Sequence, residues 1–382
     1  MMKKIVLLGI MLFSLFSSLY AQDFYWESPE PLYSGDSRFP IAASLDGRAA
    51  VVWQELDSVS AEGGRIWLSI RYFDGVSWHE NRRFAGPIPY AGEVPSIASL
   101  ALASESRVFI PVAAGENRIY VYSSADGCRN FERTVLNGSS SSVLSPHLFE
   151  RSDGGFFIFA SKGGEENFSL VVSRSDDGSS WSSFSDFSAT SALRRPFLPV
   201  HAAVSGRDVV VFQAFYEGSA RPSYQLYSTY SDDAGLTWSE PVLFTDFGEA
   251  GSQDAVAGRF ENFHNQRPSV MSFGGKLSLV WERARTASQR YSIFYAELDS
   301  RGMLANQAER ISSADGYCYD PQIAEYQGLP AVVWYDNRKG SNRVYLALKD
   351  GYLWSERELS RESRDSVFGR VVSVSGALEV YW

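Results

Sequence analysis

Cysteine and histidine are scarce in this chain, and their spacing matches no metal site. Among 382 residues there are only two cysteines, Cys128 and Cys318, which form no Cys-x-x-Cys motif, and the four histidines are scattered. Structural zinc requires closely spaced cysteine or histidine ligands. Glycine (31) and proline (15) occur at ordinary frequency, which excludes collagen-like and linker-dominated sequence. We therefore expect a folded protein without a metal or a cofactor.

Net positive charge is also lacking. Lys and Arg number 35 against 45 Asp and Glu, which gives a formal net charge of −10. Such a chain repels polyphosphate, so nucleic acid is not an expected partner unless one face is locally basic. Aromatic residues, by contrast, make up 14% of the chain, and hydrophobic residues 45%. This composition excludes general disorder and favours strands.

The first 21 residues resemble a removable leader. Lys3 and Lys4 precede an apolar stretch over residues 5–20, and Ala21 supplies a small residue at a plausible cleavage point. We expect a signal peptide over residues 1–21 and a mature chain over residues 22–382 that is exported to the periplasm or beyond the cell. The alternative is an uncleaved anchor. No cysteine follows the apolar stretch to carry a lipid, and no later segment approaches membrane-spanning length.

The mature chain contains an internal repeat. A proline is followed by glycine seven residues later and by an aromatic residue thirteen residues later. The clearest copies are Pro40/Gly47/Trp53, Pro199/Gly206/Phe212, Pro268/Gly275/Trp281 and Pro321/Gly328/Trp334. Less regular copies begin at Pro95, Pro146 and Gly369. Each copy predicts a hairpin of two strands joined by a glycine turn.

A second hairpin signal follows each repeat aromatic by about twenty residues. Its fullest form is Ser231-Asp232-Asp233-Ala234-Gly235-Leu236-Thr237-Trp238, and shorter forms contain Asp74, Asp126, Asp177 and Asp350. Four strands in roughly fifty residues is the pattern of a propeller blade. We predict a single all-β domain, a seven-bladed β-propeller of four-stranded blades, with an incomplete last blade closed by the N- and C-terminal strands. The alternative is a six-bladed ring.

The second signal carries a family resemblance. Ser-x-Asp-x-Gly-x-Thr-Trp resembles the Asp-box, or BNR repeat, of the sialidase-like β-propellers. The resemblance implies structural roles for Asp74, Asp126, Asp177, Asp233 and Asp350. In such a turn the carboxylate accepts amide hydrogens, the glycine supplies positive φ, and the Trp wedges between neighbouring blades.

Blade geometry places several arginines on one face of the ring, which we call the top face. Arg38, Arg195 and Arg267 lie near inner-strand starts, while Arg283 and Arg338 follow second-strand ends. Guanidinium groups suit a carboxylate or sulfate ligand, because they bond two oxygens at once. The alternative is that Glu55, Glu217, Glu282 and Asp336 pair with arginines across blades. Cys128 and Cys318 are predicted on opposite faces and therefore as free thiols.

The sialidase resemblance implies further roles. Ser37-Arg38-Phe39-Pro40 is similar to the motif whose arginine holds the substrate carboxylate. Tyr319 matches the tyrosine nucleophile, Arg283 a second carboxylate clamp, and Glu62 an acid/base. The glutamate that should activate the tyrosine is missing, because its expected positions hold Leu198-Pro199 and Gln266-Arg267. A tyrosine with an ordinary pKa is a poor nucleophile without such a base.

These observations favour an exported, non-catalytic BNR-type propeller. It would bind an anionic glycan or an envelope protein through a top face containing Arg38, Arg195, Arg267, Arg283, Arg338 and Tyr319. The first alternative is an exo-sialidase-like glycoside hydrolase, and the second is an envelope scaffold propeller.

Overall fold

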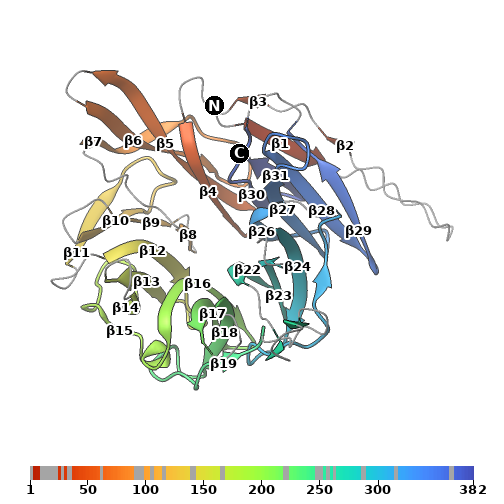
Figure 1. Cartoon of the computed structure of the whole chain (residues 1–382). Coiled ribbons are helices and arrows are strands. Elements are labelled where there is room, and N and C mark those ends of the chain that lie inside the picture. Colours follow the sequence, from red (N-terminus) through yellow and green to blue (C-terminus); the bar gives the residue numbers. More distant parts are fainter. Residues whose placement is uncertain are drawn as a thin grey trace.

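The structure is a computed structural model of the whole chain. It describes residues 3–8, 25–26, 30–31, 37–60, 63–89, 99–103, 107–113, 118–137, 143–163, 168–217, 223–245, 253–254, 259–260, 264–284, 290–313, 317–360 and 365–382. These residues form strands, turns and loops, with one short 3₁₀ helix, η1 (Ser188–Thr190). The fold is an all-β propeller, and its sheets are arranged around a central axis (Figure 1).

Six four-stranded antiparallel sheets form the blades, numbered here in chain order. Blade 1 is β4 (Ser37–Leu45), β5 (Arg48–Ser60), β6 (Gly63–Phe73) and β7 (Arg82–Pro89). Blade 2 is β8 (Ala101–Leu102), β9 (Val108–Ala113), β10 (Arg118–Ser124) and β11 (Glu132–Asn137). Blade 3 is β12 (Val143–Glu150), β13 (Phe156–Lys162), β14 (Ser169–Ser175) and β15 (Ser185–Asp186).

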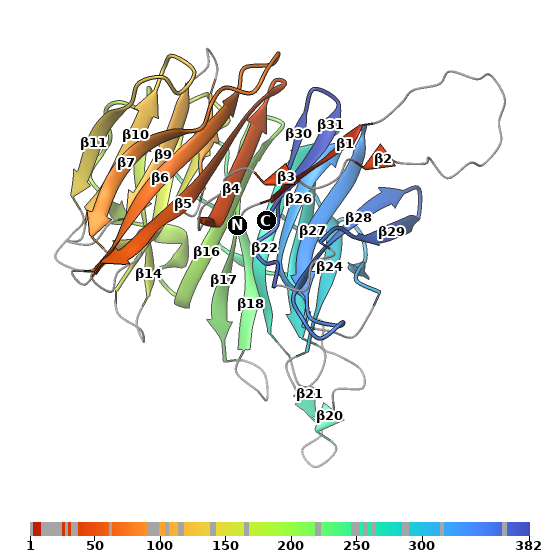
Figure 2. The same cartoon turned by 90° about the horizontal axis from the view of Figure 1, so that it is seen from above.

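The remaining three blades continue in the same order. Blade 4 is β16 (Arg194–Val204), β17 (Arg207–Tyr216), β18 (Ser223–Ser231) and β19 (Val242–Leu243). Blade 5 is β22 (Asn265–Phe273), β23 (Lys276–Ala284), β24 (Tyr291–Leu298) and β25 (Glu309–Arg310). Blade 6 is β26 (Tyr319–Tyr326), β27 (Leu329–Asp336), β28 (Arg343–Asp350) and β29 (Leu353–Glu358). A separate hairpin, β20 (Gln253–Asp254) and β21 (Arg259–Phe260), projects from the ring between blades 4 and 5 (Figure 2).

A terminal sheet joins the two ends of the chain. It contains β30 (Arg370–Val374), β31 (Ala377–Tyr381), β1 (Lys3–Leu8), β2 (Tyr25–Trp26) and β3 (Glu30–Pro31). β30 contacts β26 of blade 6 and β4 of blade 1, so the sheet closes the ring. The number of four-stranded blades is therefore six, the alternative count. The terminal sheet takes the place predicted for an incomplete last blade, and Trp26 lies in its outer strand as expected.

The strand β1 falls inside the segment predicted as a removable leader. It pairs antiparallel with β31 from Lys4↔Tyr381 to Leu8↔Ala377. This pairing supplies the third strand of the terminal sheet, for which the sequence offered no candidate. The described residues contain no helix long and apolar enough to cross a membrane.

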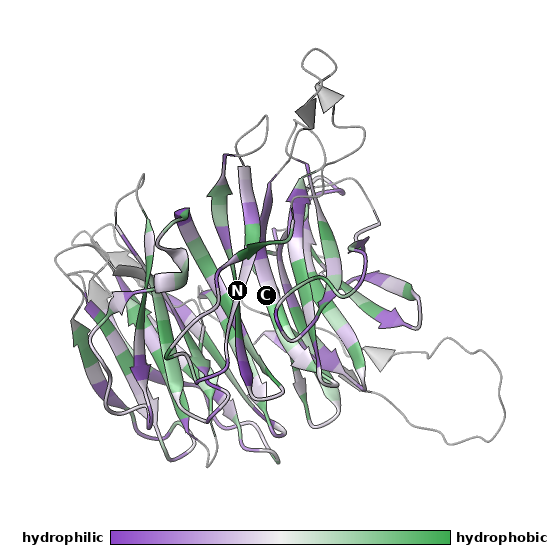
Figure 3. Cartoon of the chain, turned by 90° about the horizontal axis from the view of Figure 1, so that it is seen from below, coloured by the Kyte–Doolittle hydropathy of each residue, from purple (hydrophilic) through white to green (hydrophobic). Residues whose placement is uncertain are grey.

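The repeat aromatic of blades 1, 4, 5 and 6 packs against the preceding sheet, whereas Phe159 of blade 3 packs with Val210 and Phe212 of the following sheet. Trp53 packs with Val372 and Tyr381 of the terminal sheet. Trp281 lies in one cluster with Val211 of blade 4, and Trp334 in one cluster with Val280 of blade 5. Hydrophobic residues lie along the strands between the sheets (Figure 3). The core is thus a series of layers between neighbouring blades, which explains why the aromatic recurs at a fixed place in each repeat.

Candidate functional site

The inner strands meet in a ring, and their first residues form one end of it, which we call the mouth. The ring consists of β4, β8, β12, β16, β22, β26 and β30, each in contact with the next (Figure 1). At six of these strands a non-glycine residue at the mouth has positive φ, near +50°: Phe39, Ser145, Leu198, Arg267, Asp320 and Phe368. Five of them directly precede the proline of the repeat.

This left-handed backbone is unusual for residues other than glycine. The strand pairing shifts register around the same positions, for example between Gln266 and Ser269 and between Tyr319 and Gln322. Such conformations persist where the surrounding structure fixes them, and they cluster at functional sites. The repeat proline therefore marks, in sequence, the residue that each strand presents at the mouth.

Aromatic side chains form a continuous arc at the mouth across blade 6, the terminal sheet and blade 1. We call Tyr317, Tyr319, Tyr335, Phe368 and Phe39 the aromatic arc. Consecutive ring centroids lie 6.3, 5.6, 5.8 and 5.1 Å apart. The two ends of the arc are open to solvent, since Phe39 is 40% exposed and Tyr317 37% exposed. Tyr291 of blade 5 also stacks near Tyr319, at 5.8 Å.

An ionic network lies beside the arc and links blades 5 and 6 to the terminal sheet. Arg267 Nη1 donates to both carboxylate oxygens of Glu282, at 3.1 and 3.3 Å. The Asp320 amide donates to Glu282 Oε1 at 2.6 Å, and Arg370 Nη1 donates to Asp320 Oδ2 at 2.6 Å. Gln266 Nε2 completes the shell of Glu282 at 3.1 Å.

The two carboxylates of this network, Glu282 and Asp320, differ in how far they are buried. Glu282 is 0% exposed, and its oxygens are occupied by donors from Arg267, Asp320 and Gln266. Burial raises the pKa of Glu282, an effect that the Arg267 charge and the hydrogen bonds oppose. Asp320 is partly exposed at the mouth, with Arg370 beside it. Asp320 is therefore the carboxylate of the network that can meet a ligand.

Tyr319 and Tyr335 stay protonated at neutral pH. Desolvation, followed by the charge of Glu282, raises the pKa of Tyr319 above its ordinary value. Desolvation raises the pKa of Tyr335 to about 12. Within the described residues no carboxylate hydrogen-bonds to the Tyr319 hydroxyl. A neutral hydroxyl can donate a proton, but its environment disfavours the tyrosinate that a nucleophile requires.

The acidic residues at the second-strand ends all hold arginines, as the structural alternative predicted, although within a blade rather than across blades. Glu55 accepts from Arg83 at 2.7 Å, and Glu217 accepts from Arg194. Asp336 binds Arg338, which also binds Glu356. Arg338 is thus occupied on both sides and largely buried, so it is a poor candidate for ligand binding.

The other predicted site residues are spread around the ring. Arg38 is exposed on β4, next to Phe39 of the arc. Arg283 lies with its guanidinium 4.7 Å from the ring centroid of Phe294, away from the mouth network. Arg195 lines a pocket between blades 3 and 4. Glu62 lies outside the described residues. Of the predicted ligand-binding set, the structure places Arg267 in the ionic network, Tyr319 in the aromatic arc beside it, and Arg38 next to Phe39 of the arc.

Residue patterns alone did not identify the rest of the mouth. Asp320, Phe39 and Phe368 hold left-handed positions, and Tyr335 lies beside Phe368. The signal that could have found the first two is their place directly before a repeat proline.

The predicted aspartate turns lie at the opposite end of the blades. Asp74, Asp126, Asp177 and Asp233 each accept at least one turn amide. Asp299, in a weakly recognisable copy, does the same for Arg301 and Met303. Asp350 is instead the exposed last residue of β28. The Trp residues of these turns pack against the preceding sheet, as Trp238 does against Phe157 and Phe187.

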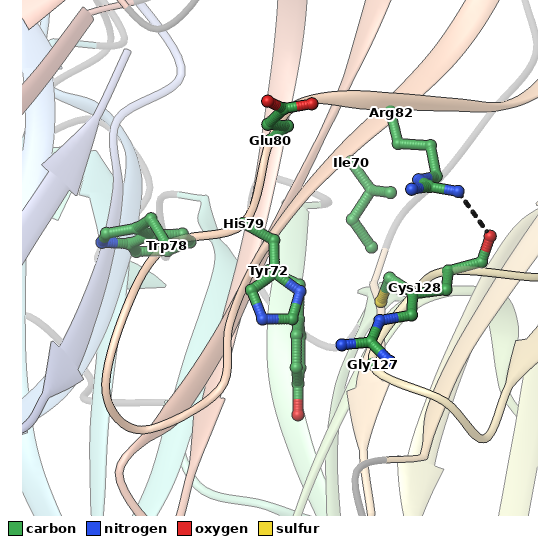
Figure 4. Close-up of a pocket in the computed structure, with 9 residues that line it drawn as sticks. Ile70, Tyr72, Trp78, His79, Glu80, Arg82, Gly127 and Cys128 are labelled. Atoms are coloured by element: carbon green, nitrogen blue, oxygen red, sulfur yellow. Dashed lines mark hydrogen bonds between the residues drawn. The ribbon is translucent and has the colours of Figure 1, made fainter.

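A small pocket also lies among these turns, between blades 1 and 2 (Figure 4). It has a volume of about 330 Å³ and is lined by Tyr72, His79, Arg82 and Cys128. Arg82 closes one side by donating to the Arg129 carbonyl at 2.7 Å. Desolvation raises the pKa of Cys128 to about 12, so this thiol is unreactive at neutral pH. Cys128 and Cys318 are both free, as predicted.

Within the described ranges, no three His, Cys, Asp or Glu side chains are grouped so as to hold a metal ion.

Comparison with solved structures supports the β-propeller fold. No family model and no curated protein matches the sequence. A PL25 ulvan lyase matches 90% of the chain over 89% of its own length, with a TM-score of 0.58 and 10% identity. The GH93 α-L-arabinofuranosidase of Fusarium graminearum, solved with arabinobiose, matches 82% of the chain over 92% of its own length, with a TM-score of 0.52 and 13% identity. The NanB sialidase of Streptococcus pneumoniae matches 85% of the chain over 68% of its own length, with a TM-score of 0.50 and 12% identity.

These matches contradict the expectation of a non-catalytic binding propeller. The matched propellers are enzymes, namely glycoside hydrolases and polysaccharide lyases, so the enzyme alternative is the better supported one. At 10–13% identity the likeness itself extends to the fold alone. The BNR resemblance remains a prediction, because no family model matches.

Proposed function

We propose that this protein is a carbohydrate-active enzyme that cleaves a glycan bound at the mouth of the propeller. The observation that carries the proposal is the aromatic arc beside the Asp320–Arg370 pair. Aromatic faces stack on the apolar faces of sugar rings, while charged groups next to them fix orientation. The enzymes that share this fold act on carbohydrates, which agrees with such a site.

The described side chains offer both partners that hydrolysis needs. Glycoside hydrolysis uses one group that protonates the leaving oxygen and a carboxylate on the other side of the bond. The raised pKa of Tyr319 keeps its hydroxyl protonated, so we assign it the donor role. Asp320 is assigned the base that takes a proton from water, while Arg267, 44% exposed, orients an acidic group of the glycan.

In this scheme the atoms balance without a co-reactant. The bond between the anomeric carbon and the leaving oxygen breaks, and the leaving oxygen takes the Tyr319 proton. Water adds to the anomeric carbon and gives its proton to Asp320. Proton exchange with solvent restores both groups.

The test is a panel of substrates with matched variants. Arabinan, ulvan and a fluorogenic sialoside are incubated with the protein, and new reducing ends, unsaturated ends or released dye are measured. Asp320→Asn and Tyr319→Phe are expected to lose about 100-fold or more in kcat. Asp350→Asn and Tyr352→Phe, which alter exposed residues away from the mouth, should retain full activity. Absence of cleavage across the panel, or full activity in both mouth variants, would refute the proposal.

The sialoside arm addresses the finer, sialidase-type assignment. That assignment uses Arg38 and Arg283 as carboxylate clamps, Tyr319 as nucleophile and Glu62 as acid/base. Sialoside turnover that disappears in both Arg38→Ala and Tyr319→Phe would support it. Cleavage of a polysaccharide with an inactive sialoside arm would favour the donor role of Tyr319.

We also propose that the protein is exported and that residues 1–21 are removed. The charged start, apolar stretch and Ala21 support this proposal. In the processed chain the terminal sheet would be the incomplete seventh blade of the ring, without β1. N-terminal sequencing of the protein recovered from the culture medium or periplasm tests the cleavage point, and a start at Met1 would overturn it.

A further inference from the structure

A second pocket opens between blades 3 and 4 and is lined by positive charge. It has a volume of about 590 Å³. We call it the side pocket and define it by Lys162, Phe168, Asp186, Arg194 and Arg195. Of the thirteen residues that line the pocket, three are cationic and Asp186 is acidic, in a protein whose net charge is −10. The pocket lies apart from the arc and from the ionic network of the mouth.

The two arginines of the side pocket lie beside the same aromatic ring. Their guanidinium carbons lie 5.5 Å (Arg194) and 5.7 Å (Arg195) from the ring centroid of the same residue, Phe215. Glu217 pairs with Arg194. Both guanidinium groups line the pocket, so an oxyanion bound there can accept hydrogen bonds from either arginine.

The third cation is only loosely neutralised. Lys162 Nζ lies 3.6 Å from Asp186 Oδ1, beyond hydrogen-bond distance, and the Asp186 side chain is mostly exposed. An exposed pair of this kind contributes little and is screened by salt. A ligand oxyanion can therefore recruit Lys162 at small cost.

The pocket also presents an aromatic surface. Phe168 lines it, and the Phe168 ring stacks on Phe197 with centroids 5.7 Å apart and planes at 28°. The Phe197 ring supports Phe168 from outside the pocket lining. A flat apolar ring beside several cations suits a ligand with one apolar face and a negative group, as in an acidic sugar.

The backbone connects this pocket to the mouth. Arg194 and Arg195 begin β16, and three residues later Leu198 holds the left-handed position at the mouth. At about 3.3 Å per residue this separation is roughly 10 Å. The arc lies on blade 6, the terminal sheet and blade 1, so a glycan chain that spans the mouth as far as Leu198 of blade 4 can extend into the side pocket.

We propose that the side pocket is an accessory subsite for an acidic sugar unit, carboxylated or sulfated, of the same glycan. The choice of a sugar rests on the proposed function, whereas the preference for a negative group rests on the pocket alone. The site would add affinity and select acidic polymers over neutral ones.

Binding, not turnover, is the readout. A tetrasaccharide of galacturonic acid, a sulfated galactose tetrasaccharide and maltotetraose are titrated calorimetrically into the wild type. We expect the two acidic probes to bind at least tenfold more tightly than maltotetraose, with affinity that falls as salt rises. The comparison between the two acidic probes separates carboxylate from sulfate recognition.

Variants locate the binding. Lys162→Gln/Arg195→Gln should weaken the acidic probes at least tenfold, and Phe168→Ala should weaken all three probes. The matched control is Lys276→Gln/Arg301→Gln, which removes the same charge from exposed positions at the far end of blade 5. Failure of the acidic probes to bind the wild type, unchanged affinity in the pocket variants, or equal weakening in the control overturns the inference.

The mouth variant separates this inference from the proposed function. Asp320→Asn should abolish cleavage while the side pocket still binds the acidic probes. Charge-dependent binding without any cleavage would remove the enzyme proposal alone. Cleavage that persists with unaltered binding in the pocket variants would remove the subsite alone.

Discussion

At the residue scale, close approach between blades decides which glycines are essential. Gly235, in a turn of blade 4, has φ +77°, and a Cβ there would lie 2.3 Å from the ring of Phe157 in blade 3. Gly206 has nearly the same φ, +75°, but a Cβ there would meet nothing within 4 Å. The two positions therefore separate backbone strain from steric exclusion.

We expect Gly235→Ala to destabilise the protein more than Gly206→Ala. Both variants place a side chain in the left-handed region, at a cost of about 1–2 kcal/mol. Gly235→Ala adds overpacking against Phe157, about 1–3 kcal/mol more. Urea unfolding of the two variants measures the difference in stability. Equal losses of unfolding free energy would show that blades 3 and 4 move apart to accommodate the added methyl group.

The turn carboxylates supply a pH dependence. Asp233 accepts hydrogen bonds from the Thr237 hydroxyl and amide, at 2.6 and 2.8 Å, and these bonds lower its pKa from 3.8 to about 2. A carboxylate with a lowered folded pKa stabilises the fold above its unfolded pKa and loses that contribution as pH falls towards the folded value.

The melting temperature of Asp233→Asn should therefore lie below that of the wild type at pH 5 and above. The gap should narrow between about pH 4 and pH 2, where the wild-type carboxylate takes up its proton. Thermal scans across this range make the comparison, with Asp350→Asn as the exposed control. A gap that stays constant down to pH 2 would contradict the turn's role.

At the element scale, the network around Glu282 ties β22 to β26 and, through Asp320 and Arg370, β26 to β30. Glu282 of β23 accepts from Arg267 of β22 and from the Asp320 amide of β26, and Asp320 accepts from Arg370 of β30, so the network joins three inner strands. When the cation that pairs with a buried carboxylate is removed, the uncompensated charge destabilises the folded state. The network is therefore expected to stabilise this part of the ring as well as shape the site.

In Arg267→Met we expect Glu282 to take up a proton in the folded state. Burial already raises its pKa, and loss of the Arg267 charge raises it further. A raised folded pKa gives stability that is present below the unfolded value, near 4.5, and is lost as pH rises. The variant should lose about 3–5 kcal/mol at neutral pH and less near pH 5.

Urea unfolding at pH 5 and pH 8 measures this loss. Arg267→Lys, which keeps a positive charge, serves as the control and should show a smaller pH effect. Equal destabilisation of Arg267→Met at both pH values would mean that Glu282 stays charged without its partner.

Features formed within one blade could be predicted from the sequence, whereas features formed between sheets could not. The proline repeat predicted the inner hairpins because its spacing is fixed by one blade, and Trp53 and Trp334 lie in the second strands of the hairpins β4–β5 and β26–β27. The aromatic arc could not be predicted, since its members come from three sheets and only ring closure brings Phe39 next to Phe368. Arg338 was misleading for a different reason, because Asp336 and Glu356 of its own blade already occupy it.

At the scale of the whole molecule, closure depends on both chain ends. β31 is paired on one side with β30 and on the other with β1. The inner surface of the terminal sheet packs between blades 6 and 1 through Val371, Val372 and Tyr381. The ring therefore stays closed through β30 and β31, while β1 protects the outer edge of β31.

A form that begins at Gln22 should fold with the same ring but lower stability than the form that begins at Met1. It loses the β1 ladder, and the open edge of β31 is expected to favour self-association. Thermal unfolding and light scattering of the two purified forms at several concentrations test this expectation. Identical melting temperatures and monomers in both forms would show that β1 adds nothing to the terminal sheet.

If the proposed export signal is removed, Lys3–Leu8 are removed with it, and β31 loses the strand that pairs with it. A cell that removes them releases a molecule whose last strand carries unsatisfied amides and carbonyls along one side. Removal of the leader would then leave the edge of β31 free to pair with a strand of another molecule. In the unprocessed precursor β1 would cover that edge.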